Sequence, residues 1–199
     1  MISSRVSREA VEAIELMYQA GWTDGLPVVP PLQELVDDFV RFVDGSPEDV
    51  VGEIPPLGGK ATLAKVAANA VMAGCRPEYM PVVLAALDAM LDEKFNLGGM
   101  QCSTHLSTPL LIVNGPIRHE LGINCGANVF GQGWRANATI GRAVKLILVN
   151  IGGAVPGETD KATLGHPGKY SYCIGENEEE SRWDPLHVER GFKRDDSTV

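Results

Sequence analysis

Clusters of proline and glycine divide this chain into short pieces. The segment GWTDGLPVVPP at residues 21–31 contains two glycines and three prolines, and another such cluster follows at residues 55–59. Proline fixes its own φ and has no amide hydrogen to donate within a helix, so a helix cannot pass through either cluster. The fold must therefore be built from short elements that these loops separate.

Apolar residues repeat at helical spacing between these loops. Residues three, four, seven and eight apart are apolar, which is the pattern of an amphipathic helix. Pro81 suits the first turn of a helix, while Gly74 and the pair Asp44-Gly45 suit helix ends. The sequence predicts helices at residues 8–20, 32–43, 63–73, 81–91 and 140–151.

The middle of the chain carries the signs of a small sheet. Residues 108–113 form a short apolar run closed by Asn114-Gly115-Pro116, as expected of a buried strand that ends in a turn. Residues 100–105 are a candidate neighbouring strand, and residues 170–174 a further short one. We expect an α/β (or α+β) fold, with a helix-rich single domain over residues 1–192 around a small, partly buried sheet. The tail at 193–199 is expected to be frayed.

Length and charge exclude several classes of protein. A chain of 199 residues buries one substantial core, and its net charge of −9 repels phosphate backbones and acidic membrane surfaces. The apolar run at 144–151 is broken by Lys145 and falls far short of the ~20 residues that cross a bilayer. The charged N-terminus lacks the pattern of a signal peptide. We expect a cytoplasmic protein that binds neither nucleic acid nor membranes.

The loop GINCGANVFGQGWRANATIG at residues 122–141 leads into the apolar helix and is a candidate anion site. Asn137 and Thr139 are suited to cap the helix, and Arg135 and Arg142 flank its start. The unpaired amides and positive dipole end of a first turn attract anions, so a carboxylate or phosphate could bind here, with Arg135 as a bidentate clamp. The alternative is an irregular loop with an ordinary N-cap.

Two asparagines extend this hypothesis to the end of the buried strand. Ligands of open α/β sheets bind outside the carboxyl ends of the strands, which would bring Asn114 and Gly115 to the same site. Asn124 and Asn114 would then orient the polar groups of the ligand.

The four cysteines form no CxxC pair and are expected to be reduced thiols. Cys125 lies in the Gly/Asn loop, where positive groups would favour its thiolate. Cys102 and His105 could form a nucleophile or half a metal site if a tight turn brings them together. The alternatives are a buried Cys102 with a partly exposed His105, and a dispersed metal site of Cys102, His105, Cys125 and His166. Cys75 follows a helix end and is expected to be structural.

The region 166–192 mixes acidic and aromatic residues. Glu176 and Glu178 belong to a run of acids that is more typical of a solvated face than of a general acid or base. Trp183, Pro185 and Phe192 are expected to anchor an irregular segment against the body of the protein.

The chain contains the motifs GWTDGLPVVPP, AVMAGCRPEYMPVVLAAL, LLIVNGP, RANATIGRA, HPGKYSYC and WDPLHVERGF. Together they resemble a known bacterial family, over almost all of residues 21–192. The resemblance implies a gene neighbourhood with genes of small-molecule catabolism and with proteins that bear a (seleno)cysteine-Gly-Ser-Cys motif, which are thiol–disulfide oxidoreductases. This chain has no such motif, so a redox role would belong to a partner or need Cys125 or Cys102. Relatives continue beyond the equivalent of Val199, which implies a separate subunit or a shortened chain.

The sequence thus favours an enzyme, or the small subunit of a heteromeric enzyme, that acts on a small carboxylated metabolite. A lyase, a hydratase or a thiol-assisted redox step would each fit, with Cys125, His105 or Cys102 as the reactive group. The residues indicate no particular cofactor, and an oligomer is expected. The alternatives are a non-catalytic structural subunit bound to a thiol-redox partner, and a metal-binding protein that uses Cys and His.

Overall fold

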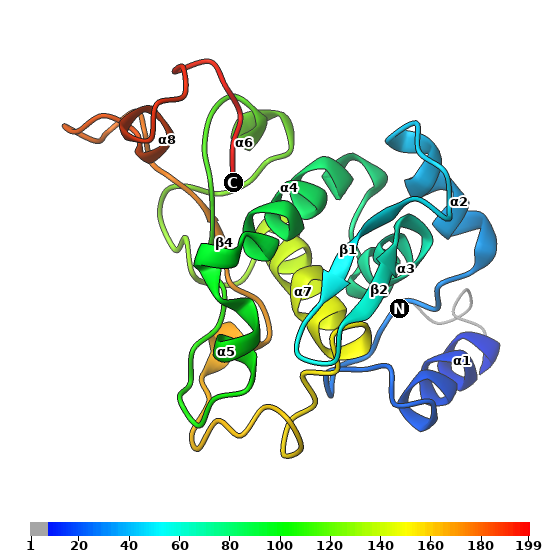
Figure 1. Cartoon of the computed structure of the whole chain (residues 1–199). Coiled ribbons are helices and arrows are strands. Elements are labelled where there is room, and N and C mark those ends of the chain that lie inside the picture. The colour runs from blue at the N-terminus through cyan, green and yellow to red at the C-terminus, as the bar shows by residue number, and fades with distance from the viewer. Residues whose placement is uncertain (1–7) are drawn as a thin grey trace.

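Helix α7 (Arg135–Asn150) is the central element of the fold (Figure 1). It packs against α3 (Leu63–Ala73), α4 (Met80–Leu91) and the strand β4 (Cys173–Gly175). Most of its residues are buried. A helix that is apolar on nearly every side belongs in a protein core, and α7 takes that place here.

The computed structural model describes residues 8–199. The N-terminal stretch used above to exclude a signal peptide lies partly outside these residues. Helix α1 (Arg8–Gln19) opens the described chain and has no buried residue, whereas α2 (Gln33–Phe42) packs its face of Val36, Phe39 and Val40 against α3. The core is therefore made by α2, α3, α4 and α7, and α1 lies at its margin (Figure 1).

The strands form two separate pairs. Strand β1 (Val50–Ile54) is antiparallel to β2 (Gly59–Thr62), and β3 (Leu111–Val113) is parallel to β4. The β1–β2 hairpin approaches the end of α7 so closely that a Cβ at Gly59 would overlap the carbonyl group of Ile151. The protein is thus a helix-rich α/β domain, as predicted, with its strands in two small sheets and not in one.

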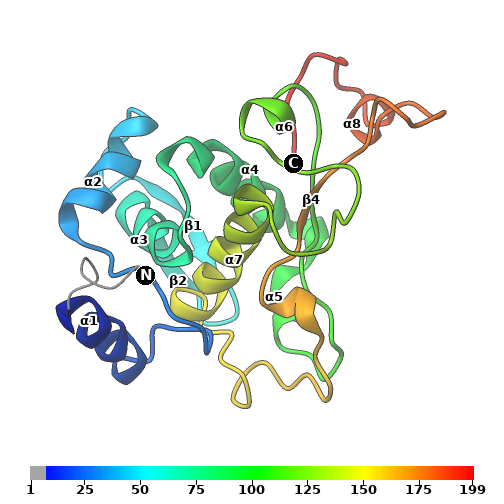
Figure 2. The ribbon, with the colours of Figure 1, turned by 180° about the vertical axis from the view of Figure 1, so that it is seen from behind.

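Short helical turns complete the architecture and connect the larger elements. In both views α6, α8 and the C-terminus lie at one end of the molecule, and α1 lies at the other (Figures 1 and 2). These turns are α5 (Leu97–Gln101), α6 (Ile117–Glu120), α8 (Leu186–Glu189), η1 (Pro77–Tyr79), η2 (Glu93–Phe95) and η3 (Pro167–Lys169).

The five predicted helices are confirmed as α1, α2, α3, α4 and α7. Gly74 ends α3 in the left-handed conformation, with φ of 89°, and Pro81 lies in the first turn of α4. The predicted strand at 100–105 is wrong, because α5 and a turn occupy these residues. The β1–β2 hairpin was not expected, since its strands flank a segment predicted only as a Pro/Gly loop.

The C-terminal tail is not frayed, which corrects the prediction for residues 193–199. Asn114 and Thr198 form an antiparallel bridge through reciprocal backbone hydrogen bonds of 3.0 and 3.2 Å. Ser197 Oγ accepts a hydrogen bond from the amide of Ile117. The tail therefore seals the turn after β3. Across residues 8–199 there is no helix of the length and apolarity that a bilayer crossing requires.

Candidate functional site

The guanidinium group of Arg135 binds the end of α3 and does not form an open anion clamp. Its Nε donates to the carbonyl oxygen of Gly74 at 3.0 Å, and its Nη2 donates to that of Cys75 at 3.3 Å. These carbonyls follow the last turn of α3, where a basic side chain also complements the helix dipole. Arg135 thus links the start of α7 to the end of α3.

Arg142 is occupied by an ion pair within the chain. Its Nε and Nη2 donate to the two carboxylate oxygens of Asp24, both at 2.8 Å, and Nη2 also contacts the carbonyls of Leu26 and Pro27. The side chains of Arg142 and Asp24 are 14% and 7% exposed. This bidentate pair fixes the 21–31 loop to α7.

Asn137 and Thr139 do not cap α7, because the helix begins earlier, at Arg135. The side chain of Asn137 accepts from the amide of Asn124 at 2.8 Å and donates to its carbonyl at 3.0 Å, while Thr139 Oγ1 donates to the carbonyl of Arg135. Asn124 and Asn137 are therefore neighbours, as predicted. A cavity of about 110 Å³ is left on the Asn137 side of this helix start, which is small beside the roughly 300–1,000 Å³ of ligand sites. A second cavity, of about 320 Å³, lies beside Arg135, whose guanidinium group is already bonded to Gly74 and Cys75 in its wall.

The other predicted ligand residue, Asn114, lies at the carboxyl ends of β3 and β4, where the carbonyl of Asn124 accepts a hydrogen bond from the amide of Gly175. Its Nδ2 donates to carboxylate oxygens of Glu176 and Glu178, at 2.5 and 3.0 Å. Arg118, with a side chain 3% exposed, donates to the carbonyl of Glu176 and contacts Glu178 and Glu179. We call Asn114, Arg118, Glu176, Glu178 and Glu179 the strand-end cluster.

The strand-end cluster corrects the view of residues 176–180 as a solvated face. The Glu178 side chain is only 7% exposed, although that of Glu179 is 54% exposed. Hydrogen bonds from Arg118 and His119 lower the pKa of Glu179 to about 2. The cluster holds three carboxylates against the one guanidinium group of Arg118, and its hydrogen bonds and ion pairs link β3, β4 and α6.

Of the three residues predicted to anchor this segment, the two aromatic ones lie outside the core. Trp183 is 81% exposed and Phe192 is 52% exposed, so neither pins the segment. Pro185 is buried, as expected, and the nearby His187 is 2% exposed. Pro185 and His187, and not the aromatic side chains, hold this part of the chain against the body.

The thiols lie in contrasting surroundings. Burial raises the pKa of Cys75 and of Cys173 to about 12. Cys102 is exposed and Cys125 is intermediate. His105 is also exposed, and the amide of His105 donates to Ser103 Oγ. The expectation of a buried Cys102 is therefore wrong, and Cys75 is a buried thiol as predicted for a structural cysteine.

No metal-binding set of three His, Cys, Asp or Glu side chains forms within residues 8–199. The dispersed residues considered for such a site, Cys102, His105, Cys125 and His166, are therefore not gathered into one. His166 instead lines a cavity described below, without any of the three others.

Alkylation with iodoacetamide is expected to distinguish the four thiols. Cys102 should react first and Cys125 more slowly, whereas Cys75 and Cys173 should react only after unfolding, because a buried thiol with a raised pKa supplies almost no thiolate. Peptide mass spectrometry over time measures each rate, with the denatured protein as control. Native labelling of Cys173 as fast as that of Cys102 would contradict this assignment.

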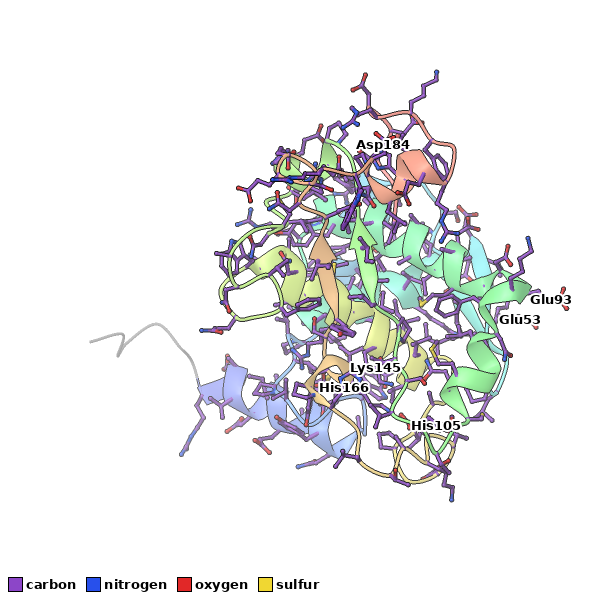
Figure 3. The ribbon with its side chains drawn as sticks, turned by 90° about the vertical axis from the view of Figure 1, so that its left-hand side faces the viewer. Glu53, Glu93, His105, Lys145, His166 and Asp184 are labelled. Carbon is purple, nitrogen blue, oxygen red and sulfur yellow. The ribbon has the colours of Figure 1, made fainter. Side chains whose placement is uncertain are left out.

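A cavity of about 560 Å³ lies beside α7, and we call it the Lys145 pocket. Its size is that of a small-molecule site. It is walled by the 21–31 loop, the C-terminal half of α7 and the loop between α7 and β4, and Figure 3 labels Lys145 and His166 in this region. The lining residues are Thr23, Asp24, Lys145, Val149, Pro156, Gly157, Asp160, Ala162, Leu164, Gly165, His166, Pro167, Lys169 and Tyr170.

Lys145 enters this pocket from the apolar second half of α7. Its side chain is only 9% exposed, and its neighbours Leu146, Ile147 and Leu148 are fully buried. Burial lowers the pKa of Lys145, and the nearby ammonium group of Lys169 lowers it further, against an opposing effect of Asp160. A lysine in such surroundings carries more free amine at neutral pH than an exposed lysine does.

Asp160 is shared unequally between the two lysines. Lys169 Nζ lies 2.8 Å from Oδ1 and 2.7 Å from Oδ2, whereas Lys145 Nζ lies 3.7 Å from Oδ2. Burial would raise the pKa of Asp160, but hydrogen bonds from Lys169 and from the Ala162 amide, together with both ammonium charges, lower it. Asp160 therefore stays ionised and satisfies Lys169, which leaves Lys145 as the less strongly paired cation.

His166 presents one defined nitrogen on the wall of this pocket. Its Nδ1 accepts a hydrogen bond from the amide of Gly168 at 3.1 Å, so the neutral ring carries its proton on Nε2. The ring lies edge-on to Tyr172, with 5.8 Å between centroids. The Nε2–H group is thus available as a hydrogen-bond donor.

The sequence holds one sign of this site that went unused as a functional signal. Lys145 interrupts the apolar run of α7, and a charged residue among core residues needs a partner or a role. Its partners, Asp160 and Lys169, lie in the long loop after α7, where the sequence shows no hydrophobic periodicity. The spatial grouping therefore could not be read from spacing.

No family model matches this chain, and neither does any curated protein or any solved structure. The functional interpretation therefore depends on the chemistry of the Lys145 pocket. The pocket combines a weakly paired amine, an ionised carboxylate, a second ammonium group and an imidazole N–H donor.

Proposed function

We propose that this protein is an enzyme, or the small subunit of a heteromeric enzyme, that acts on a small carboxylated metabolite in the Lys145 pocket. The chemistry is of the lyase or hydratase class, with the amine of Lys145 as the reactive group. The observation that supports it is the unequal sharing of Asp160, which leaves Lys145 Nζ 3.7 Å from its nearest carboxylate oxygen inside a cavity. A lysine whose charge is disfavoured by burial and by a second cation is a typical catalytic amine.

Local charge favours an anionic substrate in spite of the net charge of −9. Three cations (Lys145, Lys169 and Arg142) surround two carboxylates (Asp24 and Asp160) in or directly behind the pocket wall. One positive charge is therefore left over while Lys145 is protonated, and again whenever its nitrogen carries a positive charge in a covalent adduct. A bound carboxylate balances it in surroundings that screen charges less than bulk water does.

In our proposal, any thiol-redox step is carried out by a cytoplasmic partner protein that bears the (seleno)cysteine-Gly-Ser-Cys motif, and not by this chain. Two of the four thiols here are buried with a pKa of about 12. Cys102 is exposed and Cys125 is partly so, and neither lines the Lys145 pocket. Lysine chemistry in this chain is thus separate from any thiol chemistry.

Binding of short-chain mono- and dicarboxylates, followed by calorimetry, tests this proposal. The variant Lys169→Met should weaken binding by about tenfold or more, because a hydrogen bond to a charged group contributes about 1.5–3 kcal/mol. Asp160 keeps Lys145 as a partner in that variant, so the fold should persist. Arg135→Ala, which removes the cation at the start of α7, should leave binding unchanged. The opposite result, loss in Arg135→Ala alone, would move the site to that helix start and overturn the proposal.

A further inference from the structure

We propose that Lys145 is an imine-forming lysine, and that the substrate of the Lys145 pocket is a small carboxylate with a ketone or aldehyde group, of which 2-oxo acids are the simplest. This inference rests on the proposed function, since it names the substrate class of the same pocket. It is carried by the position of three side chains: Lys145, Lys169 and Asp160.

The geometry leaves Lys145 Nζ beyond hydrogen-bond distance of Asp160. Lys169 lies within hydrogen-bond distance of both oxygens of Asp160, at 2.7 and 2.8 Å. Lys145 Nζ lies 3.7 Å from Asp160, beyond that distance. Both oxygens of Asp160 are already used by Lys169, and Oδ1 also accepts from the amide of Ala162. The Lys145 amine therefore faces the cavity without a strong internal competitor.

The charges around Lys145 suit the product of such an attack. An imine of lysine is protonated and carries the positive charge that the ammonium group carried before, so Asp160 remains beside a cation after the reaction. Lys169 stays paired with Asp160, so the protonated imine and Lys169 together carry one positive charge more than Asp160 balances. The carboxylate next to the carbonyl of a 2-oxo acid balances that charge and a plain aldehyde does not, so the pocket favours substrates that carry both groups.

Imine formation between Lys145 and the carbonyl group needs only one proton from solvent in addition to these two reactants. The lone pair of Lys145 Nζ attacks the carbonyl carbon, a C–N bond forms, and the carbonyl π electrons move to oxygen. A proton passes from nitrogen to that oxygen, and one more proton from solvent allows it to leave as water while the C=N⁺ bond forms. His166 lines the same pocket with its proton on Nε2, and in our proposal this N–H group donates a hydrogen bond to the oxygen as its charge grows.

Reductive trapping tests the inference on the full chain. The protein is treated with pyruvate or glyoxylate and sodium borohydride, whose hydride converts an imine into a stable secondary amine. Peptide mass spectrometry then locates the label. We expect saturable labelling at Lys145 well above that at the exposed Lys94, because burial lowers the pKa of Lys145 and so leaves more of it as free amine. Lys145→Met should remove the label, while Lys94→Arg should leave it unchanged.

Lactate separates failure of this inference from failure of the proposed function. It has the carboxylate but no carbonyl, so it should bind and protect Lys145 from trapping without being trapped itself. Binding of pyruvate and lactate without label at Lys145 would overturn the imine and leave the proposed function standing. Label spread evenly over exposed lysines, and unchanged in Lys145→Met, would also overturn the imine. If neither binding nor label is found, both proposals fail.

Discussion

Replacing Asp160 with asparagine is expected to lower the free energy of unfolding by about 3–5 kcal/mol, the cost of removing one partner from a buried ion pair. The Asp160 side chain is 5% exposed and is the carboxylate that Lys145 and Lys169 share. Its loss would leave two ammonium groups facing each other across the pocket wall. Chemical denaturation of the two proteins at neutral pH measures the difference.

The pH dependence of that difference has a defined sign. The pKa of Asp160 is lowered in the folded protein, so the carboxylate stabilises the fold above its ordinary pKa of 3.8. Below that pH the contribution falls as protons bind, and the gap between the original protein and Asp160→Asn should narrow. A gap that stays constant into acid would show that the loss does not arise from the charge of Asp160.

Glu158→Gln is the matched control, because it removes the same charge from the same loop. Glu158 is exposed, and surface substitutions usually change stability by no more than about 0.5 kcal/mol. The double variant with Asp160→Asn and Lys169→Met should recover part of the loss, since only one cation then remains. Equal effects of Glu158→Gln and Asp160→Asn would show that the ion pairs of the pocket do not stabilise the fold.

The elements of the core could be predicted because each is specified locally. In α2 the apolar residues recur every three to four positions and form one buried face, and Gly74 supplies the left-handed conformation that ends α3. These signals depend on residues within one or two turns of one another. The hairpin of β1 and β2 was missed because its pairing joins residues on both sides of a loop, and nothing within either strand specifies the partner.

The location of the site could not be predicted in the same way. Arg135 and Asn137 were expected to bind a ligand because they lie at the predicted start of an apolar helix. That expectation used only neighbouring residues in the sequence. In the folded chain their polar groups meet backbone atoms of Gly74, Cys75 and Asn124, which come from other parts of the sequence. Lys145 was passed over for the converse reason, since its partners lie in a loop without periodicity. Long-range contacts decide which polar groups remain free to act.

Arg118→Met should also cost about 3–5 kcal/mol, because it removes the buried cation of the strand-end cluster. The Arg118 side chain is 3% exposed and contacts Glu178, itself 7% exposed, at 3.1 Å. It also donates to the backbone carbonyls of Gly115 and Glu176, which follow β3 and β4. Methionine keeps the apolar stem of the side chain but satisfies none of these oxygens. Denaturant titration gives the change in free energy of unfolding.

His119→Ala is the control for Arg118→Met, because His119 contacts Glu179, a carboxylate that Arg118 also contacts, from the protein surface. The His119 and Glu179 side chains are 63% and 54% exposed, and such exposed pairs contribute about 0–1 kcal/mol. In Arg118→Met the pKa of Glu179 should rise from about 2 toward the ordinary value of 4.5, which an NMR titration of that carboxyl would follow. If Arg118→Met and His119→Ala lower the free energy of unfolding equally, the buried contacts of Arg118 contribute no more stability than the exposed pair of His119 and Glu179. A larger cost for Arg118→Met, with the tail amides of Ser197 and Thr198 exchanging faster, would show that this one guanidinium group joins the strand ends to the C-terminus.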